Sequence, residues 1–408
     1  EAKQLSRMLE KAGADALHVS GMGFGDYLGY TTAIMYDPPA NLTHLAEAVK
    51  KEASIPVIAV GKISLQDGER LLQEGKADLI AIGRSLLTDP DLPNKAAEGK
   101  FEDIRPCLWC RVCGDIMLHI KRSGIRCVVN AALGHEREYD ITPAERRRRI
   151  LVIGGGPGGM EAARVAALRG HEVTLCEREP ELGGQMLLAA LPPCKDPIRD
   201  FTNYLIGQIK KSLVHVELGK EVDVSLIKSM KPDVVVLATG GTLLTPRIPG
   251  HDSSNVVTAK DVLIRNADLG IKVVVIGGGA IGCETADFLS EDGKEVTVLE
   301  MLPEFAITLG SSMRARLLAR LARKKVRMMA RVNVREISNG GVDIVDSDWQ
   351  RQSVECDTVV LAIGFEANRS LSEELGHEGI EAYLVGDCVE PRDIMEAVAD
   401  GFRVARSL

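Results

Sequence analysis

Hydrophobic positions in the first hundred residues follow two alternating spacings. Apolar residues three or four apart predict helices over 1–13, 42–52 and 65–75. Short continuous apolar runs follow each of them and predict buried strands over 14–20, 55–60 and 77–82. Alternating helices and strands indicate an α/β fold, here part of a parallel (β/α)8 barrel. Such a barrel needs eight strands, so we expect it to continue upstream of Glu1 or to be completed by another chain, and we favour a truncated sequence.

The second and third predicted strands both end in glycine followed by a basic residue, Gly61-Lys62 and Gly83-Arg84. At the C-terminal face of a barrel, glycine lets backbone N–H groups approach a phosphate, and a basic side chain offsets its charge. In the alternative interpretation the glycines only begin turns and the basic side chains point to water. The periodicity leaves both interpretations open.

Beyond residue 148 the pattern changes to strand, glycine-rich turn and helix, and this unit occurs twice. The first unit has a strand over 150–153, then Gly154, Gly156 and Gly159, and a second strand over 172–176 that ends at Glu177. The second has a strand over 272–276, then Gly277, Gly279 and Gly282, and a second strand over 295–299 that ends at Glu300. In both units the acid lies eighteen residues beyond the last glycine. The duplication predicts two dinucleotide-binding domains that face each other.

Three further features bear on these domains. The turn 182–185, ending in Gln185, follows the first acid and can bring backbone close to a flavin or its pyrophosphate. A strand near the end delivers Asp387 at a turn; this side chain either meets the flavin nucleotide or caps the helix predicted over 394–406. Glu300 can accept hydrogen bonds from a ribose 2′-hydroxyl but would repel a 2′-phosphate, which favours NADH over NADPH.

Four cysteines lie between the two patterns: Cys107, Cys110, Cys113 and Cys127. Three sulfurs at every third position allow one tight loop to surround a single centre, as in [4Fe-4S] proteins. Structural zinc, the first alternative, usually takes two separated CxxC pairs, and unligated thiols are the second alternative. The other cysteines lack CxxC spacing and are interpreted mostly as core residues; they are Cys176, Cys194, Cys283, Cys356 and Cys388.

Composition sets the remaining bounds. The net charge of −8 over 408 residues argues against a nucleic-acid partner, and the basic run 146–149 is interpreted as a solvated linker. Nine cysteines and no recognisable leader favour reduced thiols and a cytoplasmic location. No apolar run approaches the length that crosses a membrane.

The order of these parts resembles the old-yellow-enzyme-like family of 2,4-dienoyl-CoA reductase, 2-enoate reductase, bile-acid-inducible NADH:flavin oxidoreductases and trimethylamine dehydrogenase. The resemblance covers nearly the whole chain and is most specific in the stretch from Arg105 to Asn130, which carries the cysteines. It implies a partial barrel that binds FMN over 1–100 and a [4Fe-4S] segment over 101–145. It also implies an FAD domain over 146–265 plus 366–408 and an NAD(H) domain over 266–365.

The resemblance also assigns residues. The FMN phosphate would be held by Gly61, Lys62, Gly83 and Arg84, although Lys62 stands where the family more often has arginine. FAD would be lined by Gly154, Gly156, Gly159, Glu177, Gln185, Val222 and Asp387. NADH would be received by Gly277, Gly279, Gly282 and Glu300, and the cluster by the four cysteines. No catalytic acid is named, because the family brings it from the absent barrel strands; His18, Tyr27, Tyr30 and Tyr36 could reach a substrate or could equally be packing residues.

The activity that the resemblance implies is NADH-dependent reduction of a C=C bond conjugated with a carbonyl, in a small-molecule substrate. Electrons would pass from NADH to FAD, through the cluster to FMN, and then to the alkene. An amine dehydrogenase of the trimethylamine type is one alternative. An electron-transfer subunit without its own substrate site is another, and a homo-oligomer is possible for each.

Overall fold

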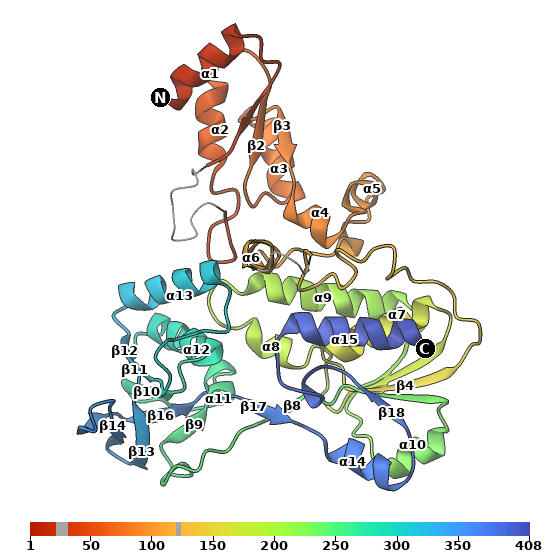
Figure 1. The fold of residues 1–408 in the computed structure, drawn as a ribbon, viewed down its shortest axis with the longest axis vertical. Helices are drawn as coiled ribbons and strands as arrows, with labels where there is room; N and C mark the ends of the chain where they lie inside the picture. The colour runs from red at the N-terminus through yellow and green to blue at the C-terminus, as the bar shows by residue number, and fades with distance from the viewer. Residues whose placement is uncertain (22–31, 120–123) are drawn as a thin grey trace.

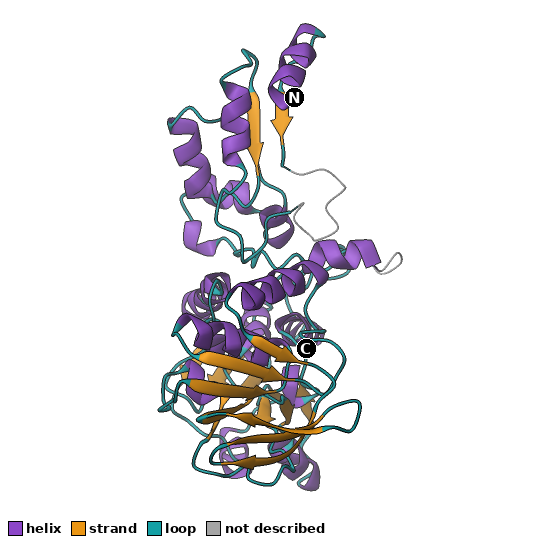
Figure 2. Ribbon diagram, turned by 90° about the vertical axis from the view of Figure 1, so that its left-hand side faces the viewer, coloured by secondary structure: helices purple, strands orange, loops and turns teal. Residues whose placement is uncertain are grey.

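The computed structural model describes residues 1–21, 32–119 and 124–408 of the chain. Figure 1 shows an elongated molecule in which a small N-terminal part stands above two larger α/β parts. The turned view separates the same parts, with the sheets of the larger ones below the partial barrel (Figure 2). Helices that could cross a membrane by their length and apolarity are absent from the described residues.

The N-terminal part is a three-stranded parallel sheet with two of its helices packed against it. Its elements are α1 (Ala2–Lys11), β1 (Leu17–Val19), α2 (Thr43–Lys50), β2 (Val57–Val60), α3 (Leu65–Gln73) and β3 (Leu79–Ala81). The strand order is β1-β2-β3, with Leu17 opposite Val57 and Ile58 opposite Leu79. A buried core of Leu17, Val57 and Leu71 joins the sheet to its helices. This arrangement is the predicted barrel segment, with three strands in the predicted order.

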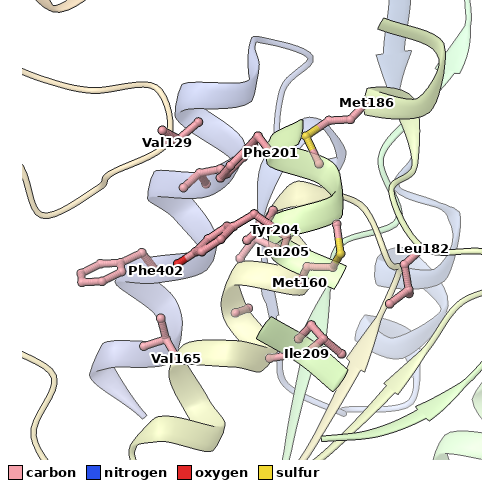
Figure 3. Close-up of a cluster of buried hydrophobic side chains, with 14 of the residues drawn as sticks. Val129, Met160, Val165, Leu182, Met186, Phe201, Tyr204, Leu205, Ile209 and Phe402 are labelled. Carbon is pink, nitrogen blue, oxygen red and sulfur yellow. The ribbon is translucent and has the colours of Figure 1, made fainter. Parts of the chain in front are cut away.

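A connecting segment leads from this sheet to the first nucleotide-type domain. It contains α4 (Arg84–Thr88), α5 (Leu92–Ala97), the 3-10 turn η1 (Phe101–Asp103) and α6 (Val112–His119). Leu108, Val128 and Val129 of this segment belong to the buried cluster that also contains Phe201. Figure 3 shows Val129 near Phe201 in that core. The cysteine-bearing segment therefore packs directly on the first nucleotide-type domain.

The first nucleotide-type domain is built on a parallel sheet of order β18-β7-β4-β5-β6. Its strands are β4 (Arg149–Ile153), β5 (Glu172–Cys176), β6 (His215–Glu217), β7 (Val234–Leu237) and β18 (Ala382–Leu384). Its helices are α7 (Pro157–Leu168), α8 (Gln185–Ala189), α9 (Asp196–Lys211), α10 (Val224–Met230), α14 (Ser370–His377) and α15 (Ile394–Ser407), with a 3-10 turn η2 (Gly386–Cys388) before α15. Helices α7 and α15 pack closely at two glycines. A Cβ at Gly401 of α15 would lie only 2.2 Å from the carbonyl oxygen of Gly158 of α7.

The second nucleotide-type domain repeats this plan with a parallel sheet of order β12-β11-β10-β16-β9. Its elements are β9 (Val256–Thr258), α11 (Ala259–Leu263), β10 (Lys272–Ile276), α12 (Ala280–Glu291), β11 (Glu295–Leu299), α13 (Ser311–Arg323), β12 (Arg327–Met329) and β16 (Thr358–Leu361). An antiparallel sheet of β13 (Asn333–Ser338), β14 (Gly341–Val345) and β15 (Arg351–Glu355) is inserted before β16. The antiparallel pair β8 (Gly241–Leu243) and β17 (Phe365–Ala367) connects the two domains: the chain leaves the first domain along β8 and returns to it along β17.

The structure shifts one predicted boundary. We predicted that the FAD domain extends to residue 265, but β9 pairs with β16 in the second sheet, with Val257 opposite Val360. Helix α11 follows β9 and packs against α12. The second domain therefore begins at about Val256, because β9 completes the edge of its sheet.

Candidate functional site

The first glycine motif joins β4 to α7, and its three glycines meet different surroundings. Gly154 has φ +111°, and a Cβ there would lie 2.2 Å from the carbonyl oxygen of Ala238. A Cβ at Gly159 would lie 1.9 Å from the carbonyl oxygen of Gly154. Around Gly156, by contrast, no atom of the described residues lies within 4 Å of that position. The first glycine thus packs against the chain that follows β7 and the third against the turn itself, while the second faces open space where a pyrophosphate can approach.

The second motif, between β10 and α12, repeats this arrangement. Gly277 has φ +107°, and a Cβ there would lie 2.4 Å from the carbonyl oxygen of Ala362. A Cβ at Gly282 would lie 1.8 Å from the carbonyl oxygen of Gly277. Gly279 faces open space, as Gly156 does. Two turns of equal geometry therefore present two helix N-termini that can receive phosphate groups.

The two acids occupy equivalent, buried positions. Glu177 accepts hydrogen bonds from the N–H of Gly155 at 2.5 Å and of Glu179 at 2.8 Å. Glu300 accepts hydrogen bonds from the N–H of Gly278 and of Leu302, both at 2.7 Å. Each carboxylate oxygen thus holds one backbone N–H and keeps a second lone pair for a ribose hydroxyl.

The other residues predicted to line FAD lie around the first motif or behind it. Gln185 begins α8, directly after Gly184, whose Cβ would lie 2.9 Å from Gly156. Asp387 lies in η2, where burial raises the pKa of its carboxyl and the N–H of Arg392 donates to it at 3.1 Å. Val222 is buried in the core on the other face of the sheet.

The alternative role for Asp387 is wrong. The residue that caps α15 is Asp393, whose side chain accepts a hydrogen bond from the N–H of Glu396 at 3.1 Å. Asp387 is therefore not used as a helix cap. Its role toward FAD stays a prediction.

The four predicted cluster cysteines line one small cavity. The side chains that surround it are Arg84, Leu87, Thr88, Cys107, Leu108, Cys110, Arg111, Cys113, Cys127, Val128 and Val129. Trp109 and Arg111 have φ +55° and +62°, so the loop curls tightly between its cysteines. The chain thus brings together sulfurs that are twenty residues apart in sequence.

Backbone N–H groups in this loop point at the sulfurs. Trp109 donates to Cys107 Sγ at 3.4 Å. Burial raises the pKa of Cys110 to about 12 and also raises the pKa values of Cys107 and Cys113. Such hydrogen bonds, and the charge of Arg84 at Cys107 and Cys113, lower these pKa values but offset only part of the effect of burial. Thiolates are the form that ligates iron.

The donor set of this cavity fits a [4Fe-4S] cluster: four cysteine sulfurs, N–H···S hydrogen bonds and an apolar wall. Among residues 1–21, 32–119 and 124–408, no group of three or more His, Cys, Asp or Glu side chains is arranged to hold a single metal ion. The cluster itself stays a prediction.

The two basic residues predicted to hold the FMN phosphate both donate hydrogen bonds to the segment 33–37, and their role toward a phosphate stays a prediction. Arg84 Nη2 donates to the carbonyl oxygen of Ala33 at 2.6 Å. Lys62 Nζ donates to the carbonyl oxygens of Met35, at 3.0 Å, and of Asp37, and burial lowers its pKa. Open space remains at Gly83, where a Cβ would meet no described atom within 4 Å. The Gly83 turn thus has room for a phosphate, and the two cations do not point to water.

Tyr36 holds the junction of the three parts, a role that the sequence did not reveal. Its ring lies 5.4 Å from Lys195 Nζ and 5.6 Å from the guanidinium of Arg320. Burial raises the pKa of its hydroxyl, which has no hydrogen-bond partner among the described residues. Lys195, which is buried, in turn forms an ion pair with Glu284 of α12, whose side chain is 13% exposed. Tyr36 is thus better explained as a packing residue than as a substrate contact.

The other candidate substrate contacts divide into two groups. His18 lies on β1 with an exposed side chain. Tyr27 and Tyr30 lie outside the described residues.

Comparisons with known proteins match two different parts of the chain to two families. Residues 148–382 match the pyridine nucleotide-disulphide oxidoreductase family, and residues 24–103 match the NADH:flavin oxidoreductase / NADH oxidase family. A 2-naphthoyl-CoA reductase structure superposes with a TM-score of 0.95 and 32% identity, covering 100% of this chain and 62% of that one.

Three curated relatives are similar over most of the chain. An NADH oxidase of Thermoanaerobacter brockii is 38% identical and covers 99% of this chain and 63% of that protein. A cinnamate reductase of Clostridium sporogenes is 34% identical, covering 100% and 61%. An N,N-dimethylglycine/sarcosine dehydrogenase of Chromohalobacter salexigens is 30% identical, covering 90% and 60%. The chain thus spans about three fifths of the length of these relatives.

The first family match alone covers more than half of the chain, and the second lies on the barrel segment. The chain belongs to the old-yellow-enzyme-like NADH:flavin oxidoreductase family, in which a barrel segment precedes a pyridine nucleotide-disulphide oxidoreductase segment.

Proposed function

We propose that the protein uses NADH to reduce the C=C bond of an α,β-unsaturated carbonyl compound. The observation that carries this proposal is the cavity lined by four cysteines, in the segment that joins the barrel sheet to the nucleotide-type domains. A relative named for cinnamate and a structural neighbour named for 2-naphthoyl-CoA support the substrate class, since both names describe unsaturated rings or chains conjugated with a carbonyl.

The chain's own residues have distinct tasks in this proposal. The Gly156 and Gly279 turns would each receive a pyrophosphate, one of FAD and one of NADH. Glu177 and Glu300 would orient the adenosine riboses through their free lone pairs. Segment 107–127 would hold the cluster against the FAD-type domain, within a common core.

Bound flavins would supply hydride chemistry and a cluster would carry single electrons between them. The protein's contribution is therefore to position the groups: the cluster segment, the Gly156 turn and the Gly279 turn follow one another in a fixed order along one chain. Lys195 and Glu284 hold the second nucleotide-type domain to the first, so that the order is kept in space.

Replacing Cys110 with alanine tests the order of the sites. We expect anaerobic reduction of FAD by NADH to continue at the wild-type rate, while reduction of an alkene such as cinnamate is lost. Cys356→Ala is the matched control, because Cys356 is buried in the core of the second nucleotide-type domain, away from the cavity. Loss of both reactions, or of neither, would contradict the proposed electron path.

An amine dehydrogenase is the second candidate, and the dimethylglycine/sarcosine dehydrogenase relative favours it. Such an enzyme would take electrons from an amine and pass them outward. The intact second motif, with Gly279 open and Glu300 in place, favours a nicotinamide reductant instead. Anaerobic mixing with NADH and then with dimethylglycine discriminates the two, since only the reductant of the physiological direction should bleach the flavin absorbance.

A further inference from the structure

Helix α13 of the second nucleotide-type domain docks on parts of the chain outside its own domain. Leu317 and Leu321 form one stripe of the helix and are buried in the core of its own domain. Met313 lies on a neighbouring stripe, is 4% exposed, and belongs to the core that the first nucleotide-type domain shares with the cysteine segment. Figure 1 shows α13 at the end of its domain that faces the barrel segment. This helix thus joins parts of the chain that fold separately.

The barrel segment holds the Met313 stripe through an ion pair and a ring contact. A guanidinium nitrogen of Arg316 lies 3.2 Å from a carboxylate oxygen of Asp37, and the two side chains are only 12% and 14% exposed. One turn further along, the guanidinium of Arg320 lies 5.6 Å from the centre of the Tyr36 ring. The Asp37 carboxylate is also held in place by its own turn, because it accepts the N–H of Ile34 at 2.9 Å. A largely buried ion pair with a fixed acceptor therefore joins α13 to the barrel segment.

The same helix is tied to the predicted NADH site through the loop between Glu300 and α13. Within this loop the N–H of Ala306 donates to the carbonyl oxygen of Gly278, in the second glycine motif, at 2.8 Å. Arg314 of α13 in turn donates to the carbonyl oxygen of Phe305 at 2.7 Å. The position of α13 and the position of the NADH site therefore depend on each other.

The covalent connection between the two nucleotide-type domains is slight. The chain crosses between them along β8 and β17, which pair over three residues each. Domains joined in this way move relative to each other unless their interface holds them. Hydride transfer needs the reacting atoms about 3–3.5 Å apart, and a misplacement of about 1 Å costs about a hundredfold in rate. The contacts that dock α13 therefore bear on transfer from NADH to FAD.

We propose that Asp37 and Arg316 are a positioning pair for hydride transfer, because they fix the second nucleotide-type domain in the orientation that brings NADH to FAD. The inference rests on the proposed NADH-dependent function. Both residues act through α13 and lie outside the two glycine motifs. The barrel segment thus contributes to the input of electrons as well as to their use.

The test is anaerobic stopped-flow reduction of the FAD-loaded holoprotein, with NADH affinity measured separately from the rate. Arg316→Gln removes the charge; we expect the rate constant at saturating NADH to fall by about tenfold or more, while the Kd of NADH stays unchanged. Arg316→Lys keeps the ion pair and should stay close to the wild-type rate. Arg323→Gln is the matched control on the same helix, because the exposed Arg323 side chain donates to Ala319 of the helix itself.

A change on the barrel side tests the pair from the other partner. Asp37→Asn removes the charge but keeps an oxygen for the N–H of Ile34, so we expect the same loss of rate. The double variant with Arg316→Gln should be no slower than the slower single variant, because both remove one interaction. The charge-transfer absorbance between bound nicotinamide and flavin reports their stacking without turnover, and it should weaken in the same variants.

The outcomes separate this inference from the proposed function. A wild-type limiting rate in Arg316→Gln, equal losses in its Gln and Lys variants, or an equal loss in Arg323→Gln would overturn the positioning role alone. A weaker NADH affinity that accounts for the whole loss would also overturn it, because Arg316 would then support the binding site itself. If Arg316→Gln does not fold, slow reduction in Asp37→Asn with normal reduction in Arg316→Lys supports the role, and equal rates in these two contradict it. Wild-type protein whose FAD is not reduced by NADH would overturn the proposed function and this inference together.

Discussion

Replacing Gly279 with alanine tests the second nucleotide site without disturbing the fold. Gly279 has φ −66° and ψ −173°, a conformation that alanine adopts readily, and its Cβ would meet no described atom within 4 Å. At such a position Gly→Ala stabilises a protein by about 0.4–1 kcal/mol, through the unfolded state. We therefore expect the free energy of unfolding to stay equal or to rise slightly.

The same methyl group would occupy the space that the pyrophosphate needs. Close approach allows hydrogen bonds from N–H groups at the helix N-terminus to a charged phosphate, each worth about 1.5–3 kcal/mol. Loss of one such bond weakens NADH binding by about tenfold to hundredfold, at about 1.4 kcal/mol per tenfold. FAD binding should not change, because its predicted site uses Gly156 in the other domain.

Gly282→Ala is the matched control with the opposite signature. Its Cβ would lie 1.8 Å from the carbonyl oxygen of Gly277, so the backbone must shift, at a cost of about 1–3 kcal/mol. The assay combines urea unfolding with anaerobic stopped-flow reduction of FAD over a range of NADH concentrations. Wild-type NADH affinity in Gly279→Ala, or destabilisation as large as in Gly282→Ala, would refute the reasoning.

Three further predictions concern single side chains. Glu300→Gln should lower the NADH over NADPH preference in kcat/KM by about tenfold, because the charge that opposes a 2′-phosphate is removed; unchanged preference would contradict this. Lys195→Met should cost about 1–3 kcal/mol in urea unfolding, since the Glu284 carboxylate, which is only 13% exposed, loses its cation, and adding Glu284→Gln should recover part of it. Burial lowers the pKa of His171, and its Nδ1 accepts a hydrogen bond from the N–H of Arg148. The neutral imidazole therefore contributes to the free energy of unfolding fully above pH 6.5, and this contribution is lost as the pH falls below that value. His171→Gln should flatten this part of the curve of stability against pH.

The sequence predicted the local units closely where one short segment determines them. The strands predicted over 272–276 and 295–299 are β10 and β11 at the same bounds, and 172–176 is β5. Each is a buried apolar run that ends at a glycine or an acid, so the neighbouring residues alone determine where the strand begins and ends. The four cysteines also follow this logic, because three of them share one loop.

Features that depend on distant pairing were not predicted. Strand β9 is only three residues long, and its place in the second sheet follows from pairing with β16, about a hundred residues later. The antiparallel sheet of β13, β14 and β15 was missed, since its polar faces obscure the alternation. Tyr36 could not be recognised as a junction residue, because Lys195 and Arg320 reach it from other parts of the chain.

The roles of Lys62 and Arg84 show a different limit. Glycine followed by a basic residue predicts a phosphate site, and this stays a prediction; what the sequence did not predict is that both side chains donate to carbonyl oxygens of the segment 33–37. A sequence motif shows that a basic residue lies at the end of a strand. The direction of its long side chain depends on hydrogen-bond acceptors from other segments of the chain, which the motif does not contain.

The central claim is that the cysteine cavity holds a [4Fe-4S] cluster between the nucleotide-type domains and the barrel segment. Iron and acid-labile sulfide analysis of anaerobically purified protein, with a paramagnetic resonance spectrum after addition of NADH, tests it most directly. We predict four irons and four sulfides per chain and a reduced-cluster signal that NADH alone produces. Zinc in place of iron, or iron that NADH leaves unreduced while FAD is bleached, would contradict the account.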